Sequence, residues 1–203
     1  MLECENCNLC SYTPQINIFD NLIKLSIKFN NIKNIDNLPE KLLYLNCSHN
    51  SIENISNLPF GLKVLICTHN NIKHLDMLPD SVVWIDCSNN PIANLDNLPS
   101  KLKWLICIGC MLSELNCLPH SIELLHCQHN QIEIFNLMYP NLTELYCGWN
   151  KIKEINCVLE TKTESKLKIL GCQYNKLKKI NNLPNSIKVL NCSGNEIFSE
   201  FEK

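Results

Sequence analysis

A cysteine that recurs every 20 residues constrains the fold of this chain more than any other feature of its sequence. When the chain is aligned on itself at that interval, the frame L-x-x-L-x-C-x-x-N-x-I-x-x-I-x-N-L-P-x-x emerges. Nine copies of this frame follow one another, and they begin at Leu22, Leu42, Leu62, Val82, Leu102, Ile122, Leu142, Leu167 and Ile187. A unit this short cannot bury its apolar side alone, so successive copies must stack and share one core.

The pattern inside each copy predicts its local structure. Apolar residues at the fourth and sixth positions alternate with variable ones, which indicates a short strand with one face turned inward. Proline comes just before the strand, as in Leu38-Pro39, where its missing N–H leaves the strand ladder intact. The asparagine at the ninth position, such as Asn50, should bond backbone groups of the turn. In the fifth copy Cys110 takes that position, and a thiol can replace the amide only in part.

From Leu22 to Ile197 the frame resembles the leucine-rich repeat superfamily, whose L-x-x-L-x-L-x-x-N/C-x-L core it matches. The 20-residue length and the Leu-Pro pairs resemble the short LPX-type repeats of bacterial effector proteins. This resemblance implies a solenoid of about nine coils, α/β by convention, with a parallel β-sheet on its concave face. Because little chain is left for the return, we expect extended or 3-10 segments on the convex face.

The same frame divides the chain. We expect residues 1–17 to form an N-terminal cap segment and residues 18–203 to form a single solenoid domain. Cys147 and Cys172 are 25 residues apart, so one coil carries a five-residue insertion, which we place near residues 158–166. Surface loops accept such added length at little cost in free energy.

Charge and composition exclude several classes of partner. The formal net charge is −2 and the isoelectric point is near 6.3, without the basic face that nucleic-acid binders carry. Neither an export signal nor an apolar run of about 20 residues is present, so we predict no membrane partner and a cytoplasmic location. The richness in Asn, Ile and Lys is similar to that of proteins of amoebal giant viruses, for which the location would be the host cytoplasm.

Fourteen cysteines raise the question of metal or disulfide chemistry. Parallel strands lie ~4.8 Å apart, so the repeated thiols would form a straight file. Zinc needs four converging ligands, and a disulfide needs Cβ atoms that point toward each other. We therefore expect the file to be core packing, with cysteine acting as a small apolar residue.

The N-terminal cluster of Cys4, Cys7 and Cys10 leaves two interpretations open. Three thiolates could hold a metal or form a redox site, although a fourth cysteine is missing. Alternatively the segment caps the first coil, and if it is helical its three thiols lie roughly on the one face that covers that coil. The sequence contains none of the motifs of nucleotide binding or hydrolysis, so we expect no cofactor and no enzymatic activity. His49 and His69, on adjacent coils, are expected to be solvated residues at the strand edge.

The residues that flank the inward pair should point to the concave side, as they do in this family. The apolar residues among them concentrate in coils three to seven, which breaks the usual alternation of a sheet that faces water. Exposed apolar patches mark interaction sites, and tryptophan and tyrosine are frequent anchors. The predicted partner-binding residues are Tyr44, Val64, Ile66, Trp84, Trp104, Ile106, Ile108, Leu124, His126, Tyr146 and Trp149.

These observations predict a protein–protein interaction module with Trp84 and Trp104 as anchors. Three alternatives stay open: self-association through the same face, coverage of that face by a terminal segment, and a metal or redox protein that uses the N-terminal cysteines. The family resemblance adds a further one, an adaptor in ubiquitin transfer or host interference, which rests on analogy alone.

Overall fold

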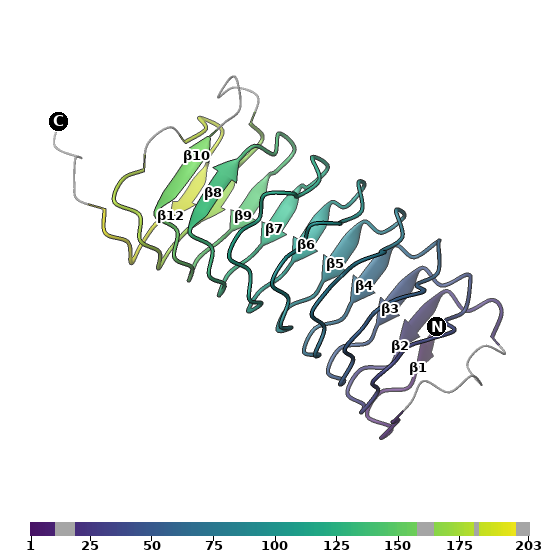
Figure 1. Ribbon diagram of the computed structural model, residues 1–203. Helices are drawn as coiled ribbons and strands as arrows, with labels where there is room; N and C mark the ends of the chain where they lie inside the picture. The colour runs from purple at the N-terminus through teal and green to yellow at the C-terminus, as the bar shows by residue number, and fades with distance from the viewer. Residues whose placement is uncertain (11–18, 158–164, 181–182, 198–203) are drawn as a thin grey trace.

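The computed structural model describes residues 1–10, 19–157, 165–180 and 183–197, and it shows these residues as a continuous stack of coils (Figure 1). A ten-stranded parallel sheet runs along the stack in the order β1-β2-β3-β4-β5-β6-β7-β9-β11-β12. Its strands are β1 (Leu2–Glu3), β2 (Lys24–Ser26), β3 (Tyr44–Asn46), β4 (Val64–Ile66), β5 (Trp84–Asp86), β6 (Trp104–Ile106), β7 (Leu124–His126), β9 (Glu144–Tyr146), β11 (Ile169–Gly171) and β12 (Val189–Asn191).

The convex side is mostly extended chain. The described ranges contain no helix, and hence none that could span a membrane. A second sheet of two parallel strands, β8 (Ile134–Leu137) and β10 (Glu154–Cys157), lies on this side, and the sequence analysis did not predict it. The first of these strands contains the consecutive residues Ile134 and Phe135, and β-branched and aromatic residues favour strands. The solenoid with a parallel sheet and about nine coils is confirmed.

Equivalent residues of successive coils stand in register. Leu45 of β3 pairs with Leu65 of β4, and both are fully buried. The cysteine two residues later, Cys47 in β3's coil, is fully buried too. The core is therefore a set of parallel files, in which each apolar side chain packs on its counterparts above and below.

The ninth-position asparagine joins each coil to the one before it. The Asn50 amide donates to the carbonyls of Ile27, Cys47 and Ser48 at 3.0, 3.0 and 3.2 Å. Its Oδ1 accepts from the Ile32 N–H of the preceding coil at 3.0 Å. The same pattern holds at Asn70, Asn90, Asn130, Asn150, Asn175 and Asn195, so the predicted role of this residue is confirmed.

The N-terminal segment is not a helix, contrary to the interpretation that would have gathered its thiols on one face. Residues 1–10 form a partial coil instead: Leu2 pairs with Leu25, and the Cys4 N–H donates to the Ser26 carbonyl at 2.8 Å. Cys4 takes the sixth position of the frame, where the recurring cysteine stands in other coils, and Cys7 takes the ninth position, where the asparagine stands. The spacing Leu2-x-Cys4-x-x-Cys7-x-Leu9 matches the L-x-C-x-x-N-x-I part of the frame, with Cys7 in place of the asparagine, and this match could have revealed the partial coil. Residues 11–17 of the predicted cap and 158–164 of the predicted insertion lie outside the described residues.

The asparagine ladder has one defect, at Cys110. The Cys110 thiol donates to the Cys87 carbonyl at 3.5 Å, but it offers no oxygen to the N–H of Ile92. That N–H bonds the Asn90 carbonyl instead, at 2.9 Å. The fourth and fifth coils are therefore joined by fewer hydrogen bonds on their turn side. Pro91 in addition lacks the N–H that the same position of other coils donates to the preceding coil, as Asn71 does to Ile52, so the third and fourth coils also lack one such bond.

Restoring the amide at this position should stabilise the protein. Because Cys110→Asn adds two to three hydrogen bonds to buried backbone groups, we expect the free energy of unfolding to rise by about 1 to 2 kcal/mol. Guanidinium unfolding followed by circular dichroism measures the change. Asn130→Cys, which makes the reverse change in the next coil, should lower stability by a similar amount. An unchanged or lower stability of Cys110→Asn would contradict the role given to the ladder.

Candidate functional site: the concave face of the sheet

The concave face consists of the side chains of the ten-stranded sheet that point away from the core, and two tryptophans lie at its middle. Trp84 and Trp104 open β5 and β6, pair with each other across the two strands, and are each 38% exposed. Their rings meet edge to face, with centroids 5.9 Å apart and planes at 74°. This geometry is a favourable one for two aromatic rings, and it leaves part of each ring open to a partner.

Five further apolar residues adjoin the tryptophan pair. Val64 pairs with Trp84, and Trp104 pairs with Leu124, so these four residues make a continuous row across β4 to β7. A parallel row two residues further along the strands contains Ile66 and Ile106, with Ile108 just beyond the end of β6. We call this group the apolar patch; it consists of Val64, Ile66, Trp84, Trp104, Ile106, Ile108 and Leu124.

Three other predicted residues extend the patch along the sheet. Tyr44 pairs with Val64 on one side. His126 pairs with Ile106 on the other side, and its ring meets that of Tyr146 at a centroid distance of 4.5 Å. Burial lowers the pKa of His126, although Glu144 and Asp86 oppose this shift. The imidazole is therefore held neutral near pH 7 and adds a flat, weakly polar surface to the patch.

The sequence analysis missed one residue of this face, Asp86. It stands in the patch between Ile66 and Ile106, and it is half-buried. Its position in the frame could have revealed it, because both neighbouring coils have an isoleucine at the position where this coil has an acid.

Trp149 belongs to a different group from the patch. It lies in the turn after β9, where its ring stacks between His129 and Tyr174 at centroid distances of 4.8 and 5.0 Å. Phe29, His49 and His69 form a second such stack, with distances of 4.4 and 4.1 Å. All six residues have a left-handed backbone, which the turn imposes on this position of the frame. The histidines are thus partners in ring stacks rather than simply solvated edge residues.

The cysteine file is part of the scaffold. Its seven buried members, from Cys47 to Cys172, lie in the common core. Burial raises the pKa of the Cys47 thiol to about 12, and several of these thiols contact the carbonyl of the next strand, as Cys107 does at 3.4 Å. The N-terminal thiols do not converge: Cys7 and Cys10 are exposed and contact the carbonyls of their own turns. Within the described ranges no three His, Cys, Asp or Glu side chains are grouped to hold a metal ion.

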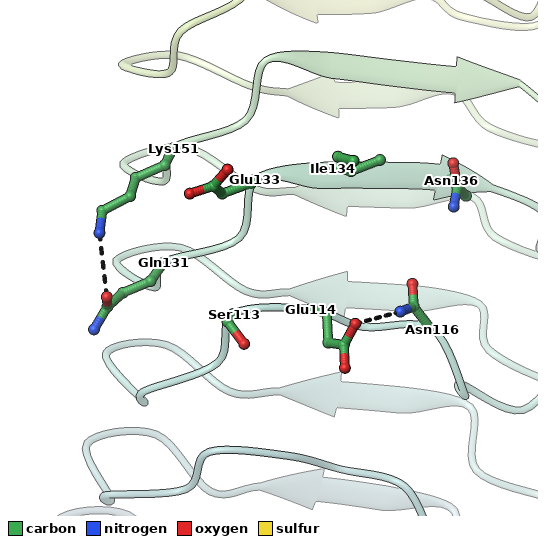
Figure 2. Close-up of a pocket in the computed structure, with 8 residues that line it drawn as sticks. All are labelled: Ser113, Glu114, Asn116, Gln131, Glu133, Ile134, Asn136 and Lys151. Atoms are coloured by element: carbon green, nitrogen blue, oxygen red, sulfur yellow. Dashed lines mark hydrogen bonds between the residues drawn. The ribbon is translucent and has the colours of Figure 1, made fainter.

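A depression of about 480 Å³ lies on the convex side, beside β8 (Figure 2). Its lining is polar and open to water, and the side chains mostly pair with one another. Lys151 donates to Gln131 at 3.2 Å, and Asn116 donates to Glu114 at 2.6 Å. Figure 2 shows these groups spread over successive coils rather than directed at one point. This depression therefore lacks the converging groups of a ligand site.

Solved structures with the same architecture identify the fold. YopM from Yersinia enterocolitica WA-314 matches with a TM-score of 0.78 and 29% identity, over 86% of this chain and 38% of the YopM chain. The leucine-rich repeat domain of a Shigella effector matches with a TM-score of 0.63 and 28% identity, over 73% of this chain and 68% of that one. The protein is a leucine-rich repeat solenoid, and it spans less than two thirds of the length of YopM.

A third solved structure has the same fold. The functional domain of InlJ from Listeria monocytogenes, described as including a cysteine ladder, matches with a TM-score of 0.63 and 22% identity. The match covers 80% of this chain and 42% of that chain, and at this identity it shows the fold alone. No family model and no curated protein sequence matches the chain.

The buried thiols should be chemically silent in the folded protein. We expect iodoacetamide to label the exposed Cys7, Cys10 and Cys117 within minutes, whereas the seven buried file members react only after denaturation, because the thiolate is the nucleophile and burial disfavours it. Mass spectrometry of tryptic peptides gives the labelling of each site. Rapid labelling of Cys87 or Cys107 in the native protein would contradict the scaffold role.

Stability should fall on mild acidification. Burial, and then repulsion from His69 and Lys28, lowers the pKa of His49 in the folded protein. The unfolded chain therefore binds the proton first, and stability is lost as the pH falls through ~6.5 toward the folded pKa. Thermal unfolding between pH 8 and pH 5.5 should show this fall, and His49→Phe, which keeps a ring in the stack, should reduce it. An identical pH dependence in His49→Phe would show that the stacked histidine is not its source.

Proposed function

We propose that the protein is a non-enzymatic interaction module that binds another protein through its concave face, with Trp84 and Trp104 as anchors. One observation carries the proposal: seven apolar side chains form a continuous patch on the face of the sheet that points away from the core. The fold does not require apolar residues there, because the opposite face of the same strands already supplies the core.

Interface energetics support the tryptophans as anchors. Binding energy at protein interfaces concentrates in a few central residues, among which tryptophan is strongly enriched. Here the tryptophan pair is central, and residues of β4 and β7 surround it. Their partial exposure leaves apolar area to be removed from water on binding, at roughly 25 cal/mol per Å² before the costs of association.

The solved structures of this fold support a protein-binding role in general. They include a Shigella effector and YopM, which is described from Yersinia pestis as a leucine-rich effector protein. The competing metal or redox role has less support, because within the described ranges no three His, Cys, Asp or Glu side chains are grouped to hold a metal ion.

Removing the two anchors should abolish binding and leave the fold intact. We expect Trp84→Ala/Trp104→Ala to lose capture of its partner from cell lysate, because the centre of the interface is removed while the buried files are untouched. The matched control is Phe60→Ala/Met77→Ala. These two side chains lie outside the patch, and they are 94% and 85% exposed. Circular dichroism checks the fold of both variants. Unchanged capture by the tryptophan variant would refute the anchors.

The molar mass of the protein in solution distinguishes self-association from binding to another protein. Light scattering of the wild-type protein distinguishes a monomer from a dimer over a range of concentrations. A dimer that the tryptophan variant converts to a monomer would show that the patch binds a second copy of this chain instead of another protein.

A further inference from the structure

The apolar patch contains a carboxylate that the fold does not need. Asp86 Oδ1 accepts hydrogen bonds from the Ser88 N–H at 3.1 Å and from the Ser88 hydroxyl at 2.7 Å. Ser88 Oγ in turn accepts from the Ile108 N–H at 3.2 Å, so this network fixes the orientation of the carboxylate.

Neutral amides do the same structural work in other coils. Asn46 Oδ1 accepts from the Ser48 N–H at 3.1 Å. Asn191 Oδ1 accepts from the Ser193 N–H at 3.2 Å and from its hydroxyl at 2.9 Å. The turn therefore requires a side-chain oxygen at this position but no negative charge. The fold therefore does not need the negative charge of Asp86. This charge stands among isoleucines and tryptophans, where removing it from water costs free energy.

No basic side chain of the described part of the chain neutralises Asp86. The ion pairs found there join Lys28 with Glu5, Lys103 with Glu123 and Lys153 with Glu133. In the ten-stranded sheet, the strands from β3 to β12 carry no lysine or arginine at the positions that point away from the core. The next position on the same side, two residues after the last of these, carries none either. The other acid among them is Glu144, on β9 at the margin of the patch.

Lys24, on β2, is the lysine within the strands of the ten-stranded sheet, and it lies outside the patch, which spans β4 to β7. Lys63, Lys103, Lys168 and Lys188 each stand one residue before a strand, so they precede the sheet instead of standing within it. Inside the patch the charge is therefore negative only, and the partly exposed indole rings of Trp84 and Trp104 stand on the same strand as Asp86 and on the next one. A cation desolvated there gains from the carboxylate, and tryptophan faces also attract cations.

We propose, resting on the proposed function, that the concave face binds a partner segment that places one arginine or lysine against Asp86, with apolar side chains packed on Trp84 and Trp104. The basic group supplies the counter-charge that the fold lacks. Apolar neighbours of that basic residue cover the patch and exclude water, which strengthens the ion pair.

The test is selection of short random linear peptides displayed on phage, with the full chain as the target. Peptides enriched on the wild-type protein should contain arginine or lysine next to aromatic or large aliphatic residues. Binding of a synthesised enriched peptide should weaken about tenfold or more in Asp86→Asn, which keeps the hydrogen bonds seen at Asn46 and Asn191 and removes only the charge. The matched control is Asp36→Asn, an exposed acid away from the patch, which changes the net charge equally and should leave affinity unchanged.

A double-mutant cycle makes the assignment specific. Replacing the basic residue of the peptide by methionine should cost little further affinity in Asp86→Asn, because the two groups form one pair. Failure to enrich peptides, enrichment of acidic or uncharged ones, or equal affinity of wild type and Asp86→Asn would overturn the inference. Enriched uncharged peptides that still need Trp84 and Trp104 would leave the proposed function standing, whereas binding that survives Trp84→Ala/Trp104→Ala would overturn that function as well.

Discussion

The side-chain amide of the ninth-position asparagine is the interaction on which the rest of this solenoid depends. Each turn leaves backbone carbonyls and an N–H pointing toward the interior, where water cannot reach them, and unpaired groups there would cost free energy. One amide satisfies groups of its own coil and of the coil before it, as at Asn90, where the Nδ2 contacts the Cys67 and Cys87 carbonyls at 2.9 Å. The same residue thus closes the turn and sets the register between coils.

Once the register is set, structure and recognition occupy different positions of the frame. The inward files, including the cysteines, are nearly invariant along the chain because each side chain must pack on its own counterpart. The outward positions carry no such restriction, so Trp84, Asp86 and Ile106 can differ from coil to coil. The recurring thiol is therefore scaffold, and the information about a partner lies in the variable residues that stand beside it.

Much of this arrangement was predictable because a repeat turns a sequence interval directly into a distance. The 20-residue period alone places Trp84 beside Trp104, and strand pairing confirms that the two residues are neighbours. What the period could not give was the orientation of individual turns. The period lists Trp149 with the concave residues, and only the structure shows that the left-handed backbone at its position goes with a ring stack on His129 and Tyr174. The convex strands β8 and β10 were not predicted either, although the frame departs from N-L-P there, with Leu137 and Cys157 in the place of the asparagine.

Residues 1–10 show a second limit of the period. Leu2 pairs with Leu25, an interval of 23 residues, so the partial first coil falls outside the 20-residue alignment although its spacing of Leu2, Cys4 and Cys7 follows the frame. Asp86 escaped for another reason. A patch chosen by apolarity omits the single charged residue within it. The neutral Asn46 and Asn191 accept the same hydrogen bonds as Asp86, which shows that the charge is dispensable to the turn.

Side-chain footprinting tests most directly whether the concave face is the binding surface. Hydroxyl radicals oxidise exposed side chains, and mass spectrometry compares the oxidation of each residue in the free protein and in the complex with its captured partner. The predicted result is strong protection of Trp84 and Trp104, with Phe60 and Met77 oxidised equally in both states. Unchanged oxidation of the two tryptophans, or protection centred on Phe60 and Met77, would contradict the concave face as the site of recognition.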